Sequence, residues 1–359
     1  MKKMLIIVCL LCIVCFVSVS VAISVYQALI PTAGHLLEAD MIPEMISQFN
    51  QTEIYDTVHY MSQVIGPRYY GTSGNTVAAS YLYNRLGNAS SRLSVEYQGA
   101  YENVIGTLQA NSSKVYVVGA HYDTVSNCPG ATDNAGGCAI VLEMARILCQ
   151  YNFTYTVKFA LWNREEGWSP TGATVYVQQA AQNTSLYLNY DSSCYDPDGR
   201  FVLDIMYNSK SVSAKDVMTE HNTLYNIGFS LTYNAHTCSS DHTPFWSAGY
   251  VAVMTHSETH GAMYHSSSDT IDKISAIYAK KNGQLGMSII AELAQITERH
   301  ARSLGDVNGD GSVDMADISL IIDNFMTSPP NWNPNCDVNN DLSIDMVDIS
   351  LAIDHFMQS

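Results

Sequence analysis

The chain has 359 residues, of which 47% are hydrophobic and 14% are charged, and its formal net charge is −17. This length and composition are typical of a globular protein with one large domain and one small one, and they exclude a disordered chain. An acidic balance without a basic patch argues against nucleic acid or anionic lipid as a partner.

The first 25 residues are predicted to be a leader. Two lysines precede an apolar run that ends near Val25, and small residues surround Ala22. The run predicts a signal peptide cleaved after Ala22 or, since about 20 apolar residues suffice to span a bilayer, an uncleaved membrane anchor. Both interpretations predict that the rest of the chain is extracellular, either secreted or held at the cell surface. Residues 26–44 are expected to be a connector.

Helical and β-type patterns alternate over the next 250 residues or so. Apolar residues three or four apart predict helices, and short β-branched or aromatic runs predict strands. The predicted helices are 45–65, 75–86, 135–150, 172–182, 213–225 and 274–300, and the predicted strands are 93–97, 103–108, 115–119, 156–162, 186–190, 201–207 and 251–255. This order predicts an α/β domain over residues 45–303, with a mostly parallel mixed sheet sandwiched by helices.

Imidazole and carboxylate side chains follow three of the predicted strands. His121 follows strand 115–119, Glu165 and Glu166 follow strand 156–162, and Asp191 follows strand 186–190. Ligands of such sheets bind beyond the carboxyl ends of the strands. These side chains are therefore expected to meet at one edge of the sheet.

The chemistry of this set fits a hydrolase that activates water on two metal ions. Such a site needs a bridging carboxylate, about three ligands for each metal and a base beside the attacking water. Asp133, in the turn before helix 135–150, suits the bridge. With it, His121 and Asp191 complete one zinc site, and Glu166 and His265 complete the other.

Three further residues are assigned roles in catalysis. Glu165 is the candidate general base, which takes a proton from the water and returns it to the leaving amine. Asp123, two residues after His121, is placed to orient that imidazole. Tyr264, beside His265, is a candidate donor to the oxyanion.

The motifs resemble a known family when they are taken in order. They are Gly119-Ala120-His121-Tyr122-Asp123-Thr124, Thr132-Asp133-Asn134-Ala135-Gly136-Gly137, Glu165-Glu166, Asn189-Tyr190-Asp191, Ser240-Asp241-His242-x-x-Phe245 and Tyr264-His265-Ser-x-x-Asp269-Thr270. Together they resemble the two-zinc aminopeptidase family that includes aminopeptidase Y and the secreted bacterial leucyl aminopeptidases. The resemblance implies a phosphorylase/hydrolase-like zinc peptidase, a peptide substrate and the ligand assignment given above.

Two departures from the family and three alternative functions stay open. Thr132 stands where the family usually has Asp, and segment 167–173 is about one residue longer than usual, which leaves the side-chain preference open. The same fold hosts carboxypeptidases and glutaminyl cyclases, and a catalytically silent binding protein is a further alternative. The presence of all five metal positions and of Glu165 favours the hydrolase.

Residues 304–359 hold an internal repeat and ten aspartates. Each copy presents oxygen ligands at positions 1, 3, 5, 7, 9 and 12 of a calcium loop. These residues are Asp306, Asn308, Asp310, Ser312, Asp314 and Asp317 in the first copy, and Asp337, Asn339, Asp341, Ser343, Asp345 and Asp348 in the second. The tail is therefore expected to bind two calcium ions.

An apolar helix follows each loop, and position 12 is aspartate rather than glutamate. A loop and one helix, repeated twice, resemble dockerin domains. The resemblance implies a cohesin-bearing partner, with Met315-Ala316 and Met346-Val347 at the positions of recognition.

The cysteines leave a further question open. Outside the leader there are six, which are either paired in disulfides or buried as free thiols. Cys128 and Cys138 bracket the Asp133 turn, so a disulfide between them would staple it.

Overall fold

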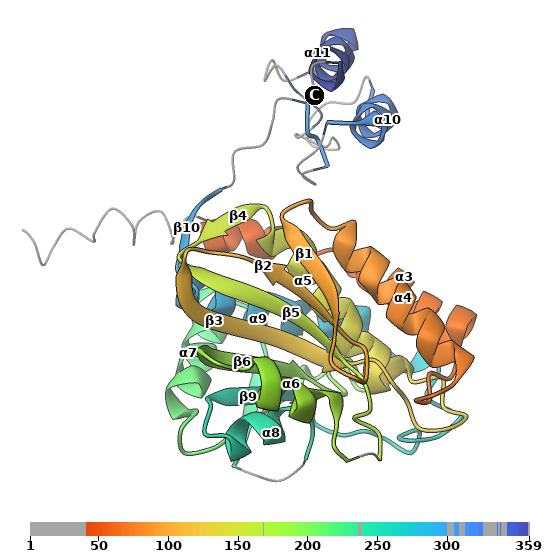
Figure 1. Cartoon of the computed structure of the whole chain (residues 1–359), viewed down its shortest axis with the longest axis vertical. Coiled ribbons are helices and arrows are strands. Elements are labelled where there is room, and N and C mark those ends of the chain that lie inside the picture. The colour runs from red at the N-terminus through yellow and green to blue at the C-terminus, as the bar shows by residue number, and fades with distance from the viewer. Residues whose placement is uncertain are drawn as a thin grey trace, which may run out of the picture.

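The computed structural model describes residues 41–167, 169–235, 239–299, 305–308, 313–325, 336, 338 and 343–357 (Figure 1). The leader and most of the connector lie outside these residues. No helix in the described ranges is both long enough and apolar enough to cross a membrane.

The large domain is built on an eight-stranded mixed sheet with the order β1-β2-β5-β3-β6-β9-β7-β8 (Figure 1). The strands are β1 (Leu93–Gln98), β2 (Asn103–Leu108), β3 (Ser112–His121), β5 (Tyr155–Trp162), β6 (Thr184–Tyr190), β7 (Val202–Tyr207), β8 (Ser230–Ala235) and β9 (Ala252–Ser257). The central strands β5, β3, β6 and β9 run parallel, whereas β1, β2 and the β7–β9 pair are antiparallel. This confirms the predicted fold class.

Helices cover both faces of the sheet. On one face lie α3 (Gln51–His59), which continues as the π-helical turn η1 (Tyr60–Ile65), α4 (Ser73–Gly87), α5 (Gly136–Leu148), α7 (Val212–Leu224) and α9 (Ala276–Leu293). On the other lie α6 (Gly172–Ala180) and α8 (His242–Ser247), which contact each other (Figure 1). A further helix spans 41–47, and η3 (Ile271–Lys273) is a 3-10 turn.

The alternation of side chains along β5 shows why the sheet has two cores. Val157, Phe159 and Leu161 belong to the larger hydrophobic cluster, which α3, α4, α5 and α9 share. Ala160 and Trp162 belong to the smaller cluster on the opposite face, beneath α6 and α8. Successive strand residues point to opposite faces, so the apolar run Phe159–Trp162 supplies both cores.

The predicted helix 274–300 is wrong at its carboxyl end. Helix α9 ends at Leu293, and Gln295 adopts a positive φ of 56°, which reverses the backbone. Residues Ile296–Arg299 then form β10, which pairs antiparallel with β4 (Tyr151–Phe153). The apolar spacing continues through Ile296, but this residue packs on the core from a strand instead.

The cysteines in the described part of the chain are free. Cys128, Cys138, Cys149, Cys194 and Cys336 are buried thiols. Of the two alternatives left open by the sequence, buried free thiols hold for these residues, and no disulfide joins Cys128 to Cys138. The Cys138 Sγ instead donates a hydrogen bond of 3.2 Å to the carbonyl of His121.

The tail forms a separate small module with two helices, α10 (Met315–Asp323) and α11 (Met346–Phe356). Its own core includes Val307, Ile318, Ile321, Ile349 and Ala352. The two helices begin alike. Asp314 and Asp345 each cap their helix in a reciprocal capping box with the aspartate three residues later.

Candidate metal centre

Three neighbouring parallel strands converge on the site. Strand β3 lies between β5 and β6, and His121 ends β3 opposite Trp162, the last residue of β5. The chain leaving β5 reaches Glu165 and Glu166 within four residues, and Asp191 directly follows β6. The predicted meeting of these residues at the carboxyl edge follows from this register.

Asp133 enters from a tight turn that precedes α5. Segment Ala131–Ala135 forms a π-helical turn. Within it, Asp133 and Asn134 have non-helical dihedral angles, and the peptide bond between them is cis. Gly136 follows, and a Cβ at this position would lie 2.2 Å from the Sγ of Cys194. Only glycine therefore lets the helix begin this close to its neighbour.

The Asp133 carboxylate lies between two imidazoles. Its Oδ1 is 3.3 Å from His121 Nε2, and its Oδ2 is 3.3 Å from His265 Nε2. Asp191 Oδ1 lies 3.5 Å from the same His121 nitrogen, and Glu166 Oε2 lies 3.0 Å from the His265 nitrogen. The five side chains thus form two half-sites that share one carboxylate.

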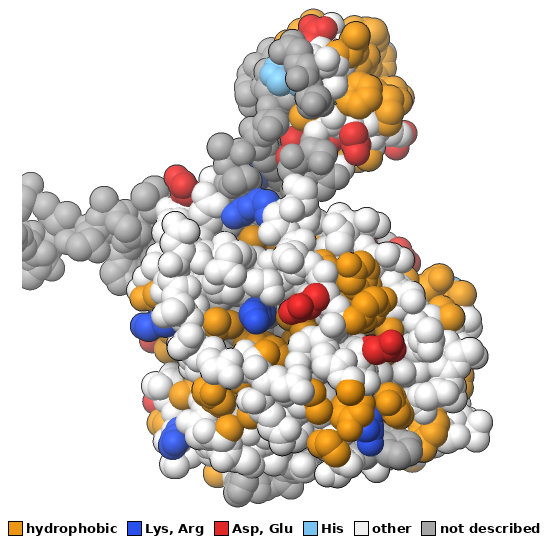
Figure 2. Space-filling model, viewed as in Figure 1, with side chains coloured by type: hydrophobic (Ala, Val, Ile, Leu, Met, Phe, Trp, Pro, Cys, Tyr) orange, Lys and Arg blue, Asp and Glu red, His pale blue; other side chains and the backbone are white. Residues whose placement is uncertain are grey.

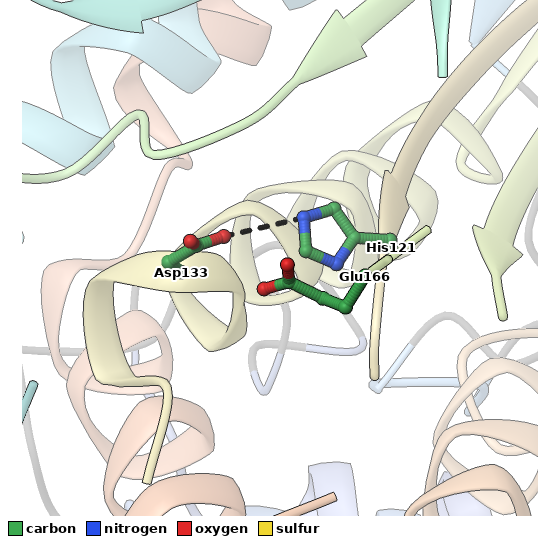
Figure 3. A group of neighbouring side chains, drawn as sticks. All are labelled: His121, Asp133 and Glu166. Carbon is green, nitrogen blue, oxygen red and sulfur yellow. Dashed lines mark ion pairs between the residues drawn. The ribbon is translucent and has the colours of Figure 1, made fainter. Parts of the chain in front are cut away.

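Donor atoms of three of these residues are close enough for a single ion. One ligand atom each from His121, Asp133 and Glu166 lie within 4.8 Å of one another, and all three residues are buried (Figure 3). In these residues, His121 Nε2 and Glu166 Oε1 lack a hydrogen-bond partner. Because buried polar atoms are normally paired, these atoms fit ligands of a cation.

The charges around this point also favour a cation. The carboxyl groups outnumber the imidazoles of His121 and His265. They belong to Asp123, Asp133, Glu165, Glu166, Asp191 and Asp241, and their charges act on one another. Such an excess of buried negative charge is costly unless positive charge is bound. The donor set of imidazole nitrogen and carboxylate oxygen is one that zinc accepts.

In the absence of metal, burial and these same contacts shift the pKa values of the site residues. Contacts with Asp133 and Glu166 raise the pKa of His265 to about 10. Burial alone would raise the pKa of Asp133, but its contacts with the two histidines lower it well below the usual value. Burial raises the pKa of Glu166 to about 7 and that of Glu165 well above its ordinary value.

Asp123 makes different contacts from those expected. Its carboxylate lies 3.7 Å from His121 Nδ1, whereas its own backbone carbonyl is closer to that nitrogen, at 3.2 Å. The carboxylate instead accepts hydrogen bonds from the backbone N–H of Glu165 (3.1 Å) and Glu166 (3.0 Å). Asp123 therefore ties the paired glutamates to the strand that carries His121.

Tyr264 lies at the rim of the site. Its ring stacks on that of His265, with the centroids 3.7 Å apart and the planes 20° from parallel. The side chain is 43% exposed, so it is accessible from the solvent side.

The sequence motifs contained further residues to which no role was assigned. Asp269 accepts hydrogen bonds from the backbone N–H groups of Thr132 and Asp133 and from the Thr132 hydroxyl. Asp241 is buried, and neither of its carboxylate oxygens has a hydrogen-bond partner. The motifs Tyr264-His-Ser-x-x-Asp269 and Ser240-Asp241-His242 were the signals that could have pointed to them.

Arg68 is the other residue that sequence reasoning left without a role. It is fully buried and donates hydrogen bonds to five backbone carbonyls. The acceptors belong to Met61, Gly66, Tyr122, Pro129 and Gly130. Two of the segments that it joins carry His121 and Asp133.

Part of the candidate calcium loops can be located in the tail. Asp317 Oδ1 accepts hydrogen bonds from the N–H groups of Val307 (2.7 Å) and Asn308 (2.9 Å), and Asp348 Oδ1 accepts one from Val338 (2.6 Å). Position 12 of each loop therefore contacts the start of the same loop. Asp306, Asp314, Ser343 and Asp345 are also described, whereas Asp310, Ser312, Asp337, Asn339 and Asp341 lie outside the described residues.

Imidazoles and carboxylates gathered at the carboxyl edge of parallel strands are the arrangement expected of a metal-dependent hydrolase. Residues 103–290, more than half of the chain, match the model of Peptidase family M28, and the chain belongs to that family. Residues 304–357 match the Dockerin type I domain. Both resemblances inferred from the sequence are thereby confirmed.

Similar proteins include an aminopeptidase of Pseudomonas aeruginosa, 38% identical over 108 residues, which are 29% of this chain and 20% of that protein. Leucine aminopeptidase 1 of Aspergillus niger is 26% identical over 264 residues, 63% of this chain and 66% of that protein. The chain thus spans about a fifth and about two thirds of their lengths. A zinc aminopeptidase structure from Bacillus subtilis has a TM-score of 0.61 at 18% identity, covering 73% of this chain and 98% of that one, and shows the shared fold.

Proposed function

We propose that the chain is an exported, zinc-dependent aminopeptidase that removes N-terminal residues from peptides. The observation that carries the proposal is the position of Asp133, whose two oxygens each lie 3.3 Å from a different imidazole. A carboxylate shared in this way is what a two-metal site requires. Zinc is the metal in the name of the B. subtilis structure, and aminopeptidase is the activity in the names of the relatives.

The ligands would be divided between two zinc ions. His121 and Asp191 would hold one, Glu166 and His265 the other, and Asp133 both. Bound zinc would supply Lewis acidity, which lowers the pKa of water and polarises the peptide carbonyl. His121 Nε2 and Glu166 Oε1, which are buried and have no hydrogen-bond partner, support this assignment.

The chain's own residues would carry the proton. Glu165 takes it from the attacking water and delivers it to the nitrogen of the leaving amine. Asp123 fixes Glu165 for this transfer through the backbone hydrogen bond described above. Tyr264, partly exposed beside His265, would donate its hydroxyl hydrogen to the developing oxyanion.

The tail would attach the enzyme to a cohesin-bearing partner after binding two calcium ions. Large apolar side chains are exposed on the helices of the small module (Figure 2). They include Met315, Ile322, Met346, Val347 and Ile353. Exposed apolar residues gathered on one module mark an interaction surface. We place the peptidase domain at 45–303 and the dockerin domain at 304–359, after the connector and the leader.

A combined metal and substrate assay tests the proposal. Elemental analysis of the purified protein should find zinc, and aminoacyl reporter substrates should be hydrolysed. Peptides with a free amino terminus should lose their first residue, whereas the same peptides acetylated at that terminus should not. Release of C-terminal residues, cyclisation of N-terminal glutamine, or the absence of turnover with zinc bound would point instead to a carboxypeptidase, a glutaminyl cyclase or a silent binding protein.

A further inference from the structure

A cleft of about 610 Å³ opens beside Glu165. One wall is the segment that leads into α6 and the first turns of that helix, and the other is helix α8 with the residues that flank it. Because Glu165 is the candidate base, a group seated in this cleft would lie next to the bond that is cut. The cleft is therefore where a substrate side chain would be selected.

The lining of the cleft is unusual for a site that selects leucine or phenylalanine. Most of the described residues that line it carry a hydroxyl or amide group, and none is aromatic. The apolar members are short, namely Val177, Pro244 and Ala248. Apart from Glu165, no described lining residue is charged.

Four of the hydroxyl groups form two pairs, one within each wall. On the α6 side, Thr171 Oγ1 lies 2.9 Å from Thr174 Oγ1. On the α8 side, Ser239 Oγ lies 3.4 Å from Thr243 Oγ1. Since a hydroxyl has one donor hydrogen and two acceptor lone pairs, each pair retains capacity for another hydrogen bond.

The chemistry of this lining discriminates among side chains. A leucine would remove the hydroxyls from water without replacing their hydrogen bonds, which is unfavourable. An acidic side chain would be repelled by Glu165, and a basic one would pair with it and compete with its role as base. A neutral side chain with its own donor or acceptor avoids all three costs.

We propose that this cleft is a subsite for a neutral, hydrogen-bonding side chain, such as threonine, serine, asparagine or glutamine, on a residue that flanks the scissile bond. The proposal rests on the proposed function and specifies its substrate class. It also gives a structural reason for the departure in segment 167–173, since that segment leads directly into the α6 wall.

Isosteric substrates test the proposal. The zinc-loaded protein is given peptide pairs that differ only as threonine against valine, or asparagine against leucine, on either side of the scissile bond. We expect kcat/KM to favour threonine over valine, and asparagine over leucine, by about tenfold on one side, as the gain of one hydrogen bond predicts. A preference for valine and leucine on both sides would overturn the proposal.

Isosteric variants identify the residues responsible. In Thr174→Val combined with Thr243→Val, the threonine-to-valine ratio should fall towards one. Thr223→Val, which removes an exposed hydroxyl from α7, is the matched control and should keep the ratio of the unaltered protein. An unchanged ratio in the double variant would contradict the proposal.

Alanyl substrates distinguish a failure of the proposed function from a failure of the subsite. Their methyl side chain has no hydrogen-bonding group, so their turnover reports on the proposed function alone. If alanyl peptides are not hydrolysed, the proposed function fails, and the subsite is tested by calorimetric titration with the same threonine and valine peptides. Equal affinity for both would then overturn the subsite, whereas tighter binding of the threonine peptide that is lost in the double variant would support it.

Discussion

Substitution of Arg68 by methionine should weaken both the fold and the metal centre. The guanidinium is fully buried and donates five hydrogen bonds of 2.6 to 3.1 Å to backbone carbonyls. One acceptor is Tyr122, which follows His121, and another is Gly130, which begins the turn that carries Asp133. The side chain therefore ties together two segments that hold candidate metal ligands.

The size of the effect can be worked out from these contacts. Each buried carbonyl left without a donor costs about 1–3 kcal/mol, whereas the carbonyls of Met61 and Gly130 keep a backbone N–H donor. Removing a buried charge offsets part of the sum, so we expect a net loss of about 3–5 kcal/mol in the free energy of unfolding. Loss of a residue that holds metal ligands in place without itself touching the metal typically weakens metal binding by about 10- to 100-fold. Arg68→Lys should fall between, because one ammonium cannot reach all five acceptors.

Arg92 provides a matched control. It also donates to backbone carbonyls, those of Cys149 (2.5 Å) and Tyr151 (2.9 Å), and to Asn152 Oδ1 (2.7 Å), none of which is a site residue. Arg92→Met should cost about 1–2 kcal/mol and leave zinc affinity unchanged. Denaturant unfolding and zinc competition with a chelator, at a temperature where circular dichroism shows folded protein, measure both effects. Equal zinc affinities in Arg68→Met and Arg92→Met would refute the reasoning.

Three further changes test other parts of the account. Glu165→Gln should retain zinc but lower kcat by about 10² to 10⁴, the usual range for a lost general base; unchanged turnover would disprove that role. Asp317→Ala together with Asp348→Ala should abolish the calcium-dependent folding of the tail, seen as helical circular dichroism that no longer responds to calcium or chelator. Burial raises the pKa of Cys149 from 9.0 to about 12. This thiol therefore stays protonated in the native state while the unfolded chain ionises, so its contribution to stability is complete below pH 9 and is lost between pH 9 and 12. Between pH 9 and 12, the free energy of unfolding of the unaltered protein should fall by about 1.4 kcal/mol per pH unit more than that of Cys149→Ala. Parallel stability curves for the two proteins would contradict this expectation.

Local patterns were enough to predict most of the fold. The apolar runs of β5 and β6 and the amphipathic spacing of α5 lie in the core, where burial makes the pattern strong. By contrast, β8 was missed because it is a sheet edge with few buried side chains, so its sequence lacks an apolar run. Helix α8 was missed because its six residues are too few to show a helical period.

Most of the candidate ligands could be predicted from position, because His121, Glu166 and Asp191 lie at or just after the end of a strand and Asp133 just before a helix. His265 lies in the loop after β9 and was indicated only by its motif. The residues that support the ligands could not be predicted, because their contacts join distant parts of the chain. Asp269 binds the Asp133 turn from 136 residues away, and the carbonyls that Arg68 contacts in the Asp133 turn lie about 60 residues on. Asp123 was expected to orient His121, whereas the hydrogen bonds of its carboxylate to the glutamate backbone depend on the β3–β5 register, which local sequence does not show.

Zinc stoichiometry tests the central claim most directly. Elemental analysis after dialysis against limiting chelator should find two zinc ions per chain in the unaltered protein and in Glu165→Gln. Asp133→Ala, which removes the carboxylate between the two imidazoles, should lose both ions while circular dichroism shows that the fold remains. One zinc ion or none in the unaltered protein, or two retained in Asp133→Ala, would contradict the account.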